Sequence, residues 1–273
     1  MKLLVQSDDF GITPAVSCGI LEAIKKGIVR NTGLFANMPW AGECVDMIRP
    51  VLGQISFGID LNVSAGPPVL PPEQIPDLVQ DNGWFLTSAM NRALDTNENN
   101  FDHVNYEAVY REFDAQVRRF QEIVGKLPDY IHGHAYGTRT TMKAMRAIAS
   151  KYNRPLSSDV LEHLNVRLGT MEWYRFGNEM QEQFKDDVKT CVLEDKSGFL
   201  NSEYGCLVTH CGYMDMKLLE LSSFTVYRMK DLEAMTCAQV RQWVADNHIQ
   251  LITWRDLQDQ MIKSGTEKNG DKA

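Results

Sequence analysis

Short apolar runs alternate with longer stretches of helical periodicity along most of the 273-residue chain. This alternation is typical of strands joined by crossover helices, which place their strands side by side in a parallel sheet. The predicted strands are residues 2–7, 31–37, 55–63, 130–134, 156–159, 206–209 and 250–254. The pattern predicts an α/β fold, a deformed (β/α) barrel of about seven parallel strands with helices packed outside.

Segments of helical period lie between the predicted strands. The first helix is predicted to begin at Thr13 and Pro14, because proline is favoured in the first turn, and to end before Gly27. Further helices are predicted over residues 43–52, 106–123 and 140–151, with one more helix between 178 and 193. We expect residues 1–263 to form a single barrel domain, followed by a polar, disordered tail at 264–273.

The charge balance argues against two classes of partner. With 28 Lys and Arg against 36 Asp and Glu, the formal net charge is −8, which repels phosphate backbones and anionic lipids. The sequence has neither the long apolar run of a transmembrane helix nor the pattern of a signal peptide. The six cysteines form no CxxC pair, which suits reduced thiols. We therefore expect a cytoplasmic protein that binds neither nucleic acid nor membrane.

Acidic and imidazole side chains fall where the predicted strands end. These residues are Asp8, Asp9, Asp60, His132, His134 and His210. The carboxyl ends of parallel strands meet at one edge of the sheet, where active sites form in this architecture. Because side chains alternate along a strand, the adjacent Asp8 and Asp9 are expected to point in different directions and to do different jobs.

This set has the chemistry of a metal-assisted active site. Carboxylates and imidazoles together suit Mg²⁺, Mn²⁺, Fe²⁺ or Zn²⁺. A remaining carboxylate and a separate histidine could then act as general base and general acid. Each residue also has a structural interpretation, because an aspartate at a strand end often caps a helix and His210 alone resembles a buried, hydrogen-bonded histidine.

Several motifs occur in an order that resembles the YdjC-like carbohydrate deacetylases. They are SDDFG at residues 7–11, GIDLN at 58–62, DNGWF at 81–85, IHGH at 131–134 and HCGYMD at 210–215. Similar runs follow, with Arg228 ahead of DLE at 231–233 and ITWRDL at 252–257. The resemblance covers nearly the whole chain, and the ordered set is more specific than any one motif.

The resemblance implies a metal-dependent hydrolase on a deformed (β/α) barrel. Its expected reaction is removal of N-acetyl groups from small amino sugars, chitooligosaccharides such as diacetylchitobiose. By position, the resemblance implies that Asp9 and His134 are metal ligands, that Asp8 is the general base and that His210 is the general acid. A small oligosaccharide is the expected partner, and a homodimer is compatible with the resemblance.

The chain departs from the family pattern at Asp60, which stands where the second ligand is usually histidine, and at His132, Tyr136 and Cys211. If Asp60 is the third ligand, an Asp, Asp, His set is harder than Asp, His, His. Such a set favours Mg²⁺ as first choice, with Mn²⁺, Co²⁺ or Zn²⁺ as alternatives. Alternatively, Asp60 and His132 are a swapped pair, with His132 serving as a ligand or orienting one.

Two other functions are compatible with these residues. The same base, metal and acid could hydrolyse another amide or an ester. A sugar-binding relative that has lost catalysis is the second alternative, supported by Asp60 and opposed by the intact base and acid. Trp40, Trp84 and Tyr213 could stack on sugar rings or simply pack against the protein.

Overall fold

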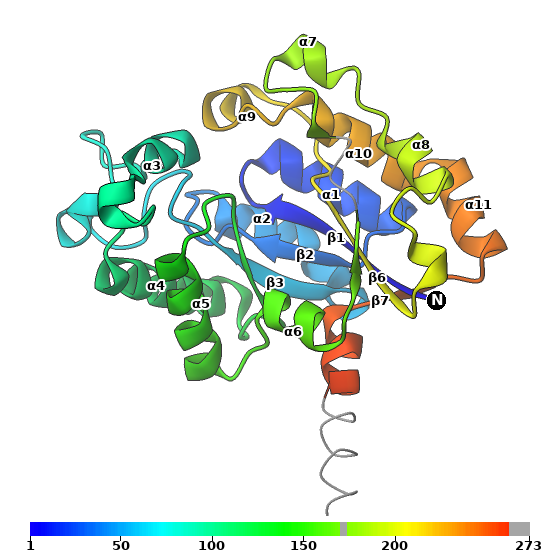
Figure 1. Ribbon diagram of the computed structural model, residues 1–273, viewed down its shortest axis with the longest axis horizontal. Helices are drawn as coiled ribbons and strands as arrows, with labels where there is room; N and C mark the ends of the chain where they lie inside the picture. The colour runs from blue at the N-terminus through cyan, green and yellow to red at the C-terminus, as the bar shows by residue number, and fades with distance from the viewer. Residues whose placement is uncertain (170–173, 262–273) are drawn as a thin grey trace, which may run out of the picture.

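One curled sheet of parallel strands forms the centre of the molecule (Figure 1). The structure is a computed structural model and describes residues 1–169 and 174–261. The strands are β1 (Lys2–Phe10), β2 (Asn31–Leu34), β3 (Ser56–Leu61), β4 (Ile131–Gly133), β5 (Arg167–Leu168), β6 (Tyr204–Thr209) and β7 (Gln250–Ile252). Their order is β4-β3-β2-β1-β6-β5, and β7 also pairs with β1. The edge strands β4 and β5 do not pair within the described residues, so the sheet is a half-barrel that confirms the predicted deformed barrel.

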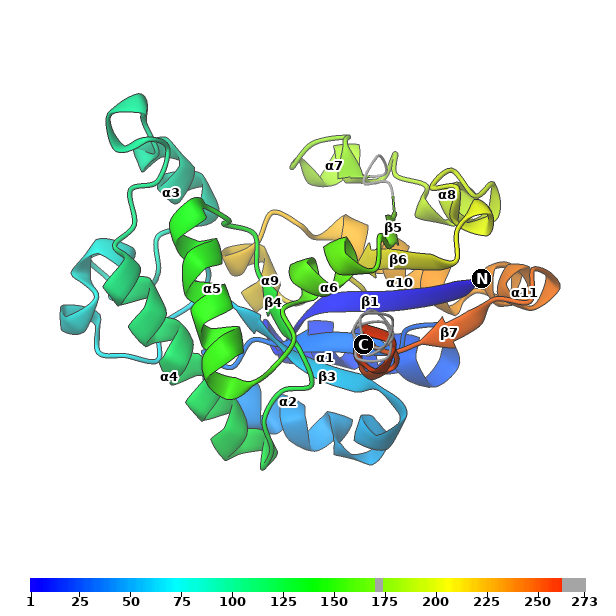
Figure 2. The ribbon, with the colours of Figure 1, turned by 60° about the horizontal axis from the view of Figure 1, so that its bottom comes forward.

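Helices surround this sheet, most of them on its outside. They are α1 (Pro14–Lys26), α2 (Ala41–Ile48), α3 (Ser88–Leu94), α4 (Tyr106–Val124), α5 (Arg139–Tyr152), α6 (Ser157–His163), α7 (Met180–Gln183), α8 (Val188–Leu193), α9 (Met216–Leu221), α10 (Val226–Thr236) and α11 (Ala238–Asp246). Helix α6 packs into the half-barrel through Val160. Figure 2 shows α4 and α5 side by side near β4, while α10 and α11 lie toward β6 and β7. Within the described residues, no helix has the length and apolar character needed to cross a membrane.

Local sequence signals explain where the first helix begins and ends. The Thr13 hydroxyl accepts a hydrogen bond from the backbone N–H of Val16, and Pro14 occupies the first helical position, where its missing N–H is not needed. The backbone N–H of Gly27 bonds to the Ala23 carbonyl as the helix ends. The predicted helix between Thr13 and Gly27 is therefore confirmed.

Two predicted elements are wrong. Residues 156–159 were expected to form a strand, but Leu156 makes only an isolated bridge to Ile131, and Ser157 begins α6. Serine and aspartate in the first turn favour a helix start over a strand. The single helix expected between 178 and 193 is two helices. The Asp187 side chain accepts the backbone N–H of Thr190 and so caps a second helix, which begins at Val188. The two-residue strand β5 has exposed residues and no apolar signal; the predicted tail at 264–273 lies outside the described residues.

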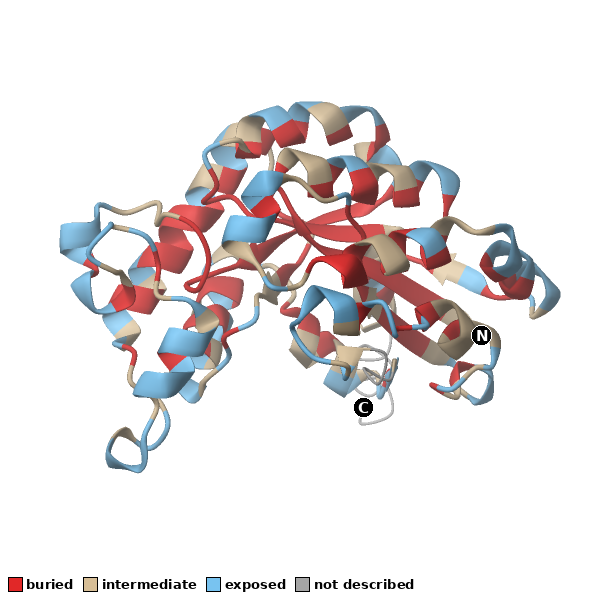
Figure 3. Cartoon of the chain, turned by 90° about the horizontal axis from the view of Figure 1, so that it is seen from above, coloured by how far each residue is buried: buried red, intermediate tan, exposed pale blue. Residues whose placement is uncertain are grey.

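The sheet separates two apolar layers of unequal size. The larger layer lies between strands and outer helices and includes Leu3 and Val5. The smaller lies inside the half-barrel and contains Leu4, Tyr130 and Trp254. Alternating side chains of β1 thus enter different layers. Figure 3 shows the central strands buried, so charged groups at the strand ends sit above a dry core.

Candidate functional site

The end of β1 departs from regular strand geometry between the two adjacent aspartates. Its pairing with β2 shifts register between Ser7 and Phe10. Asp9 has a φ of 71°, a left-handed conformation that is uncommon for a residue other than glycine. Such a conformation costs about 1–3 kcal/mol and is found preferentially at functional sites. Asp8 and Asp9 have separate sets of partners, as the alternation of side chains along a strand predicts.

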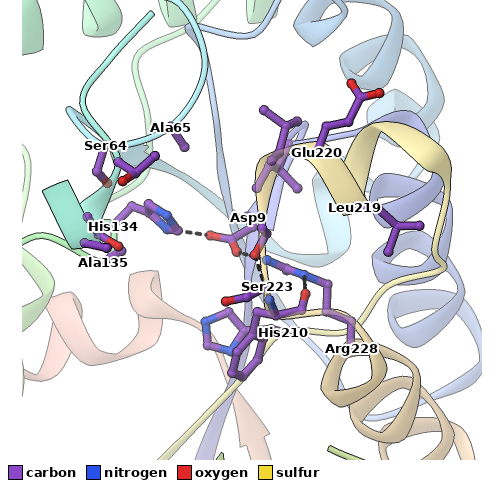
Figure 4. Close-up of a pocket in the computed structure, with 17 residues that line it drawn as sticks. Asp9, Ser64, Ala65, His134, Ala135, His210, Leu219, Glu220, Ser223 and Arg228 are labelled. Atoms are coloured by element: carbon purple, nitrogen blue, oxygen red, sulfur yellow. Dashed lines mark hydrogen bonds and ion pairs between the residues drawn. The ribbon is translucent and has the colours of Figure 1, made fainter. Parts of the chain in front are cut away.

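Asp9 lies between two basic side chains (Figure 4). Its Oδ2 accepts a hydrogen bond of 2.6 Å from Nη2 of Arg228, and Nδ1 of His134 lies 2.8 Å from its Oδ1. The side chains of Asp9 and Arg228 are each only 1% exposed. Burial by itself would raise the pKa of Asp9, but the attraction of His134 and Arg228 outweighs it and holds the pKa well below its ordinary value. Asp9 is therefore ionised at neutral pH.

His210 follows β6 and is held by Asp231 at its backbone and by Tyr174 at Nδ1 of its ring. Its backbone N–H donates to Oδ2 of Asp231 at 2.6 Å, and the Tyr174 hydroxyl lies 3.2 Å from Nδ1 of the ring and also bonds to Asp231. Burial lowers the pKa of His210, against the opposing charges of Asp9 and other carboxylates. Burial also raises the pKa of Asp231 to about 7. These contacts leave Nε2 as the ring nitrogen available to a substrate.

Asp8 belongs to a different group. Its Oδ1 accepts a hydrogen bond from Gln6, and its Oδ2 lies 3.4 Å from Nε2 of His132, whose Nδ1 is 2.7 Å from the Ser157 hydroxyl. Burial disfavours the charged forms of both groups, but their attraction lowers the pKa of Asp8 and raises the pKa of His132 to about 9. Asp8, 7% exposed, is thus a carboxylate paired with an imidazolium.

Asp60 lies behind both groups. On β3 it is the direct neighbour of His132 on β4, and its Oδ2 accepts the backbone N–H of Asp9 at 2.9 Å. A side chain at Gly33 would place its Cβ 1.9 Å from Oδ1 of Asp60, so glycine makes room for this carboxylate. Burial, followed by the nearby charge of Asp8, raises the pKa of Asp60 to about 7.

The donor chemistry of these residues fits a divalent cation in part. Oδ1 of Asp60 is buried and has no hydrogen-bond partner among the described residues, and Oδ1 of Asp9 has only Nδ1 of His134 beside it, at 2.8 Å. Buried carboxylate oxygens without partners are rare and require an explanation, which a bound cation would provide. Within residues 1–169 and 174–261, however, no three His, Cys, Asp or Glu side chains converge as a complete metal-binding group. The carboxylate of Asp9 and the imidazole of His134 lie together, and the carboxylate of Asp60 bonds to the backbone N–H of Asp9.

A cleft of about 490 Å³ opens over Asp9 and its partners but not over the pair of Asp8 and His132. Its lining includes Asp9, His134, His210 and Arg228, together with the hydroxyl-bearing residues Ser64, Thr87, Ser88, Ser222 and Ser223. The structure therefore brings three of the six predicted residues into one cleft. Asp8 and Asp60 do not line it, and His132 lines a separate pocket of about 250 Å³ that it shares with His134.

The three aromatic residues proposed to stack on sugar rings do not line this cleft. Trp40 donates its indole N–H to backbone carbonyls at the start of α1, and the Tyr213 hydroxyl bonds to Glu22 on α1. Trp84 is 40% exposed in the loop before α3. Hydrogen bonds within the protein therefore account for the positions of Trp40 and Tyr213.

Sequence reasoning assigned no role to three residues of the site. Tyr174, Arg228 and Asp231 contact His210 or Asp9, and the last two lie one turn apart on α10. One signal in the sequence was the spacing on that helix. Arg228 and Asp231 are three residues apart and share a face with apolar residues such as Leu232. Charged residues on an apolar face are rarely buried unless they are paired.

Comparisons with known proteins agree on one family and one fold. The model of the YdjC-like protein family matches residues 2–246. Carbohydrate deacetylase 2 of Listeria innocua is 28% identical over 94% of this chain and 99% of its own length. Carbohydrate deacetylase of Thermoanaerobacter pseudethanolicus is 27% identical over 93% of this chain and 98% of its own.

Solved structures show the same architecture. A putative cellobiose-phosphate cleavage protein from Enterococcus faecalis superposes with a TM-score of 0.76 and 26% identity, covering 94% of this chain and 98% of that one. Peptidoglycan deacetylase PdaC of Bacillus subtilis, in a D285S mutant, gives a TM-score of 0.50 at 12% identity, covering 99% and 96%. This second likeness concerns the fold alone.

Proposed function

The chain belongs to the YdjC-like protein family, and on that premise we propose that it is a carbohydrate deacetylase that hydrolyses the N-acetyl groups of small amino sugars such as diacetylchitobiose. The observation that carries the proposal is the cleft in which Asp9, His134 and His210 meet. The names of the aligned relatives support the deacetylase class, and the polar lining supports a sugar.

The proposed reaction needs a base and an acid. Asp8 is the proposed base because of its position in the motif that resembles the family. Its lowered pKa keeps it ionised, and although Asp8 does not line the cleft, its 7% exposed surface leaves an edge that a water molecule can approach. His210 is the proposed acid, since Tyr174 engages Nδ1 and leaves Nε2 to protonate the departing amine. An amine leaves poorly without a proton, so the acid is needed in the step that breaks the C–N bond.

A divalent cation completes the proposal. Asp9, His134 and Asp60 would hold it, and His132 would orient Asp60 or take its place. Mg²⁺ is the first choice for two carboxylates and one imidazole, and Mn²⁺, Co²⁺ and Zn²⁺ are alternatives. When bound, such an ion would polarise the acyl carbonyl and lower the pKa of a water molecule.

The proposed substrate is a short amino sugar. A cleft of about 490 Å³ falls within the range of small-molecule sites, and five of its lining residues carry hydroxyl groups that can pair with those of a sugar. The cytoplasmic location and the homodimer stay predictions. The six cysteines are all free in the structure.

The test is acetate release from diacetylchitobiose by purified protein, first stripped of metal and then supplied with Mg²⁺, Mn²⁺, Co²⁺ or Zn²⁺. Release that returns with one ion supports the proposal and identifies the ion. Release from an O-acetyl ester but not from the amide would favour an esterase. No release from either substrate with any ion would contradict a deacetylase.

A further inference from the structure

Arg228 has a buried donor nitrogen without a partner. Its Nη2 donates to Asp9 and its Nε donates to the Phe224 carbonyl at 2.8 Å, but Nη1 has no hydrogen-bond partner in the described part of the chain. Leaving a buried donor unsatisfied costs about 1–3 kcal/mol, and more for a charged group. A guanidinium that is 1% exposed therefore needs a reason to keep one nitrogen unpaired.

The position of Arg228 supplies this reason. Its side chain lines the cleft with Asp9, His134 and His210 (Figure 4). A guanidinium is planar, and its N–H directions are fixed by the fork. Because Nη2 is held by the Asp9 carboxylate, an acceptor bound at Nη1 must lie beside that carboxylate. It therefore lies at the reaction centre and not at the outer end of the cleft.

The charges select the kind of acceptor. The carboxylate of Asp9 neutralises the guanidinium, and two further carboxyl groups, Asp8 and Asp60, lie behind it. A carbonyl oxygen is neutral on binding, so its approach to this neutralised ion pair costs little. It gains negative charge only when water adds to its carbon, and a hydrogen bond from Nη1 then becomes stronger than it was to the bound substrate.

We propose that Arg228 is a catalytic residue whose Nη1 donates a hydrogen bond to the acyl oxygen of the substrate. The role rests on the proposed deacetylation. As Asp8 takes a proton from the water, the water oxygen bonds to the acyl carbon, the electron pair of the C=O double bond moves to the acyl oxygen, and Nη1 stabilises that charge. When the C=O bond re-forms, the C–N bond breaks, the nitrogen takes a proton from His210, and acetate and the amine leave.

The arginine is held in place before the reaction begins. Its Nε is bonded to Phe224, its Cζ lies 5.7 Å from the centre of the Phe224 ring, and its backbone carbonyl accepts the N–H of Gly212. A donor fixed in this way does not have to reorganise as charge develops. Loss of one such donor typically lowers kcat by about 10²–10³-fold.

The first experiment compares Arg228→Lys with the wild type. A lysine ammonium can still pair with Asp9, but it does not supply the second nitrogen of the fork. We expect kcat to fall by about 10²-fold or more with KM changed less than about fivefold. The matched control is Arg30→Lys, because Nη1 of Arg30 bonds only to backbone carbonyls of Gly27, Val29 and Ile24 and lies outside the cleft. Its kcat should equal that of the wild type.

A sulfur substitution separates contact with substrate from positioning of Asp9. Sulfur accepts hydrogen bonds weakly, so an N-thioacetyl substrate weakens any bond from Nη1 to the acyl group. If Nη1 makes that bond, the loss of kcat/KM on changing oxygen to sulfur should be at least about tenfold larger in the wild type than in Arg228→Lys. Equal losses in the two proteins would overturn the proposal and leave Arg228 as a positioning residue of Asp9.

A third measurement needs no variant and applies if Arg228→Lys does not fold. The guanidinium N–H signals of Arg228 are followed by NMR in the wild type while a phosphonamidate analogue of the tetrahedral intermediate is added. A downfield shift of the Nη1 signal supports the contact, and an unchanged signal at saturation overturns it. A wild type that neither binds the analogue nor releases acetate would contradict the proposed function and this role together, whereas normal activity of Arg228→Lys would contradict the role alone.

Discussion

Two neighbouring aspartates at the end of β1 have opposite surroundings. Asp9 faces His134 and Arg228 and opens into the larger cleft, whereas Asp8 faces Gln6 and His132 inside the half-barrel. Both carboxyl groups have lowered pKa values because basic partners outweigh burial. The two carboxylates therefore differ in whether the cleft reaches them and not in whether they are charged. It shows that one irregular residue at a strand end can give two identical side chains separate tasks.

The largest expected effect is that of Asp9→Asn. This change keeps the shape of the side chain but removes the charge between His134 and Arg228, and it leaves a buried guanidinium unpaired. We expect acetate release to fall by about 10⁴-fold or more, as for members of a catalytic unit, and the free energy of unfolding to fall by about 3–5 kcal/mol. Chemical denaturation and an acetate assay measure the two effects. Near-normal release from a folded variant would remove Asp9 from the site.

His210→Ala is expected to act on turnover more than on binding. Without the acid, kcat should fall by about 10²-fold or more, while KM stays near that of the wild type. Steady-state kinetics with diacetylchitobiose measure both constants. The control is His163→Ala, at the end of α6 and outside the cleft, whose kinetics should be unchanged. Equal losses of binding and turnover in His210→Ala would argue against the acid role.

Asp60→His tests whether Asp60, which lies between Asp9 and His132, is a metal ligand. Replacing a hard carboxylate by imidazole should raise the affinity for Zn²⁺ relative to Mg²⁺ by about tenfold or more, if the residue is a ligand. Titration calorimetry with each ion measures the affinities without relying on activity. An unchanged ratio of affinities would favour the swapped arrangement, in which His132 and not Asp60 approaches the ion.

The smallest effects come from a matched pair of hydroxyl deletions. Tyr174→Phe and Ser157→Ala each remove the oxygen next to an imidazole Nδ1, the first at His210 and the second at His132. One hydrogen bond is worth about 1 kcal/mol, so Tyr174→Phe should lower kcat about fivefold. Ser157→Ala should lower the free energy of unfolding by a similar amount and leave kcat within about twofold. Kinetics and denaturation of both variants decide this. The reverse result would place His132 at the reaction centre.

The sequence predicted most of the parallel sheet, because its buried strands carry a strong apolar signal. It also predicted the strand-end residues Asp9, His134 and His210, which the structure brings together. It missed β5, a strand of two exposed residues, and assigned a strand to Ser157, where a helix begins.

The contribution of α10 could not be predicted in the same way. Arg228 contacts Asp9 across 219 residues of sequence, and periodicity within one helix does not specify its distant partner. The alternation of side chains along β1 did predict that Asp8 and Asp9 point in different directions, but it could not predict their partners or the left-handed backbone of Asp9, with a φ of 71°.

If the proposals above are right, substrate binds on the Asp9 side of β1. The most direct measurement is an NMR titration of the imidazole nitrogens with diacetylchitobiose, since the chain has only six histidines and each can be assigned by substitution. We expect saturable shifts at His134 and His210, with a smaller change at His132. Shifts confined to His132, or no shift at any of the three, would contradict this expectation.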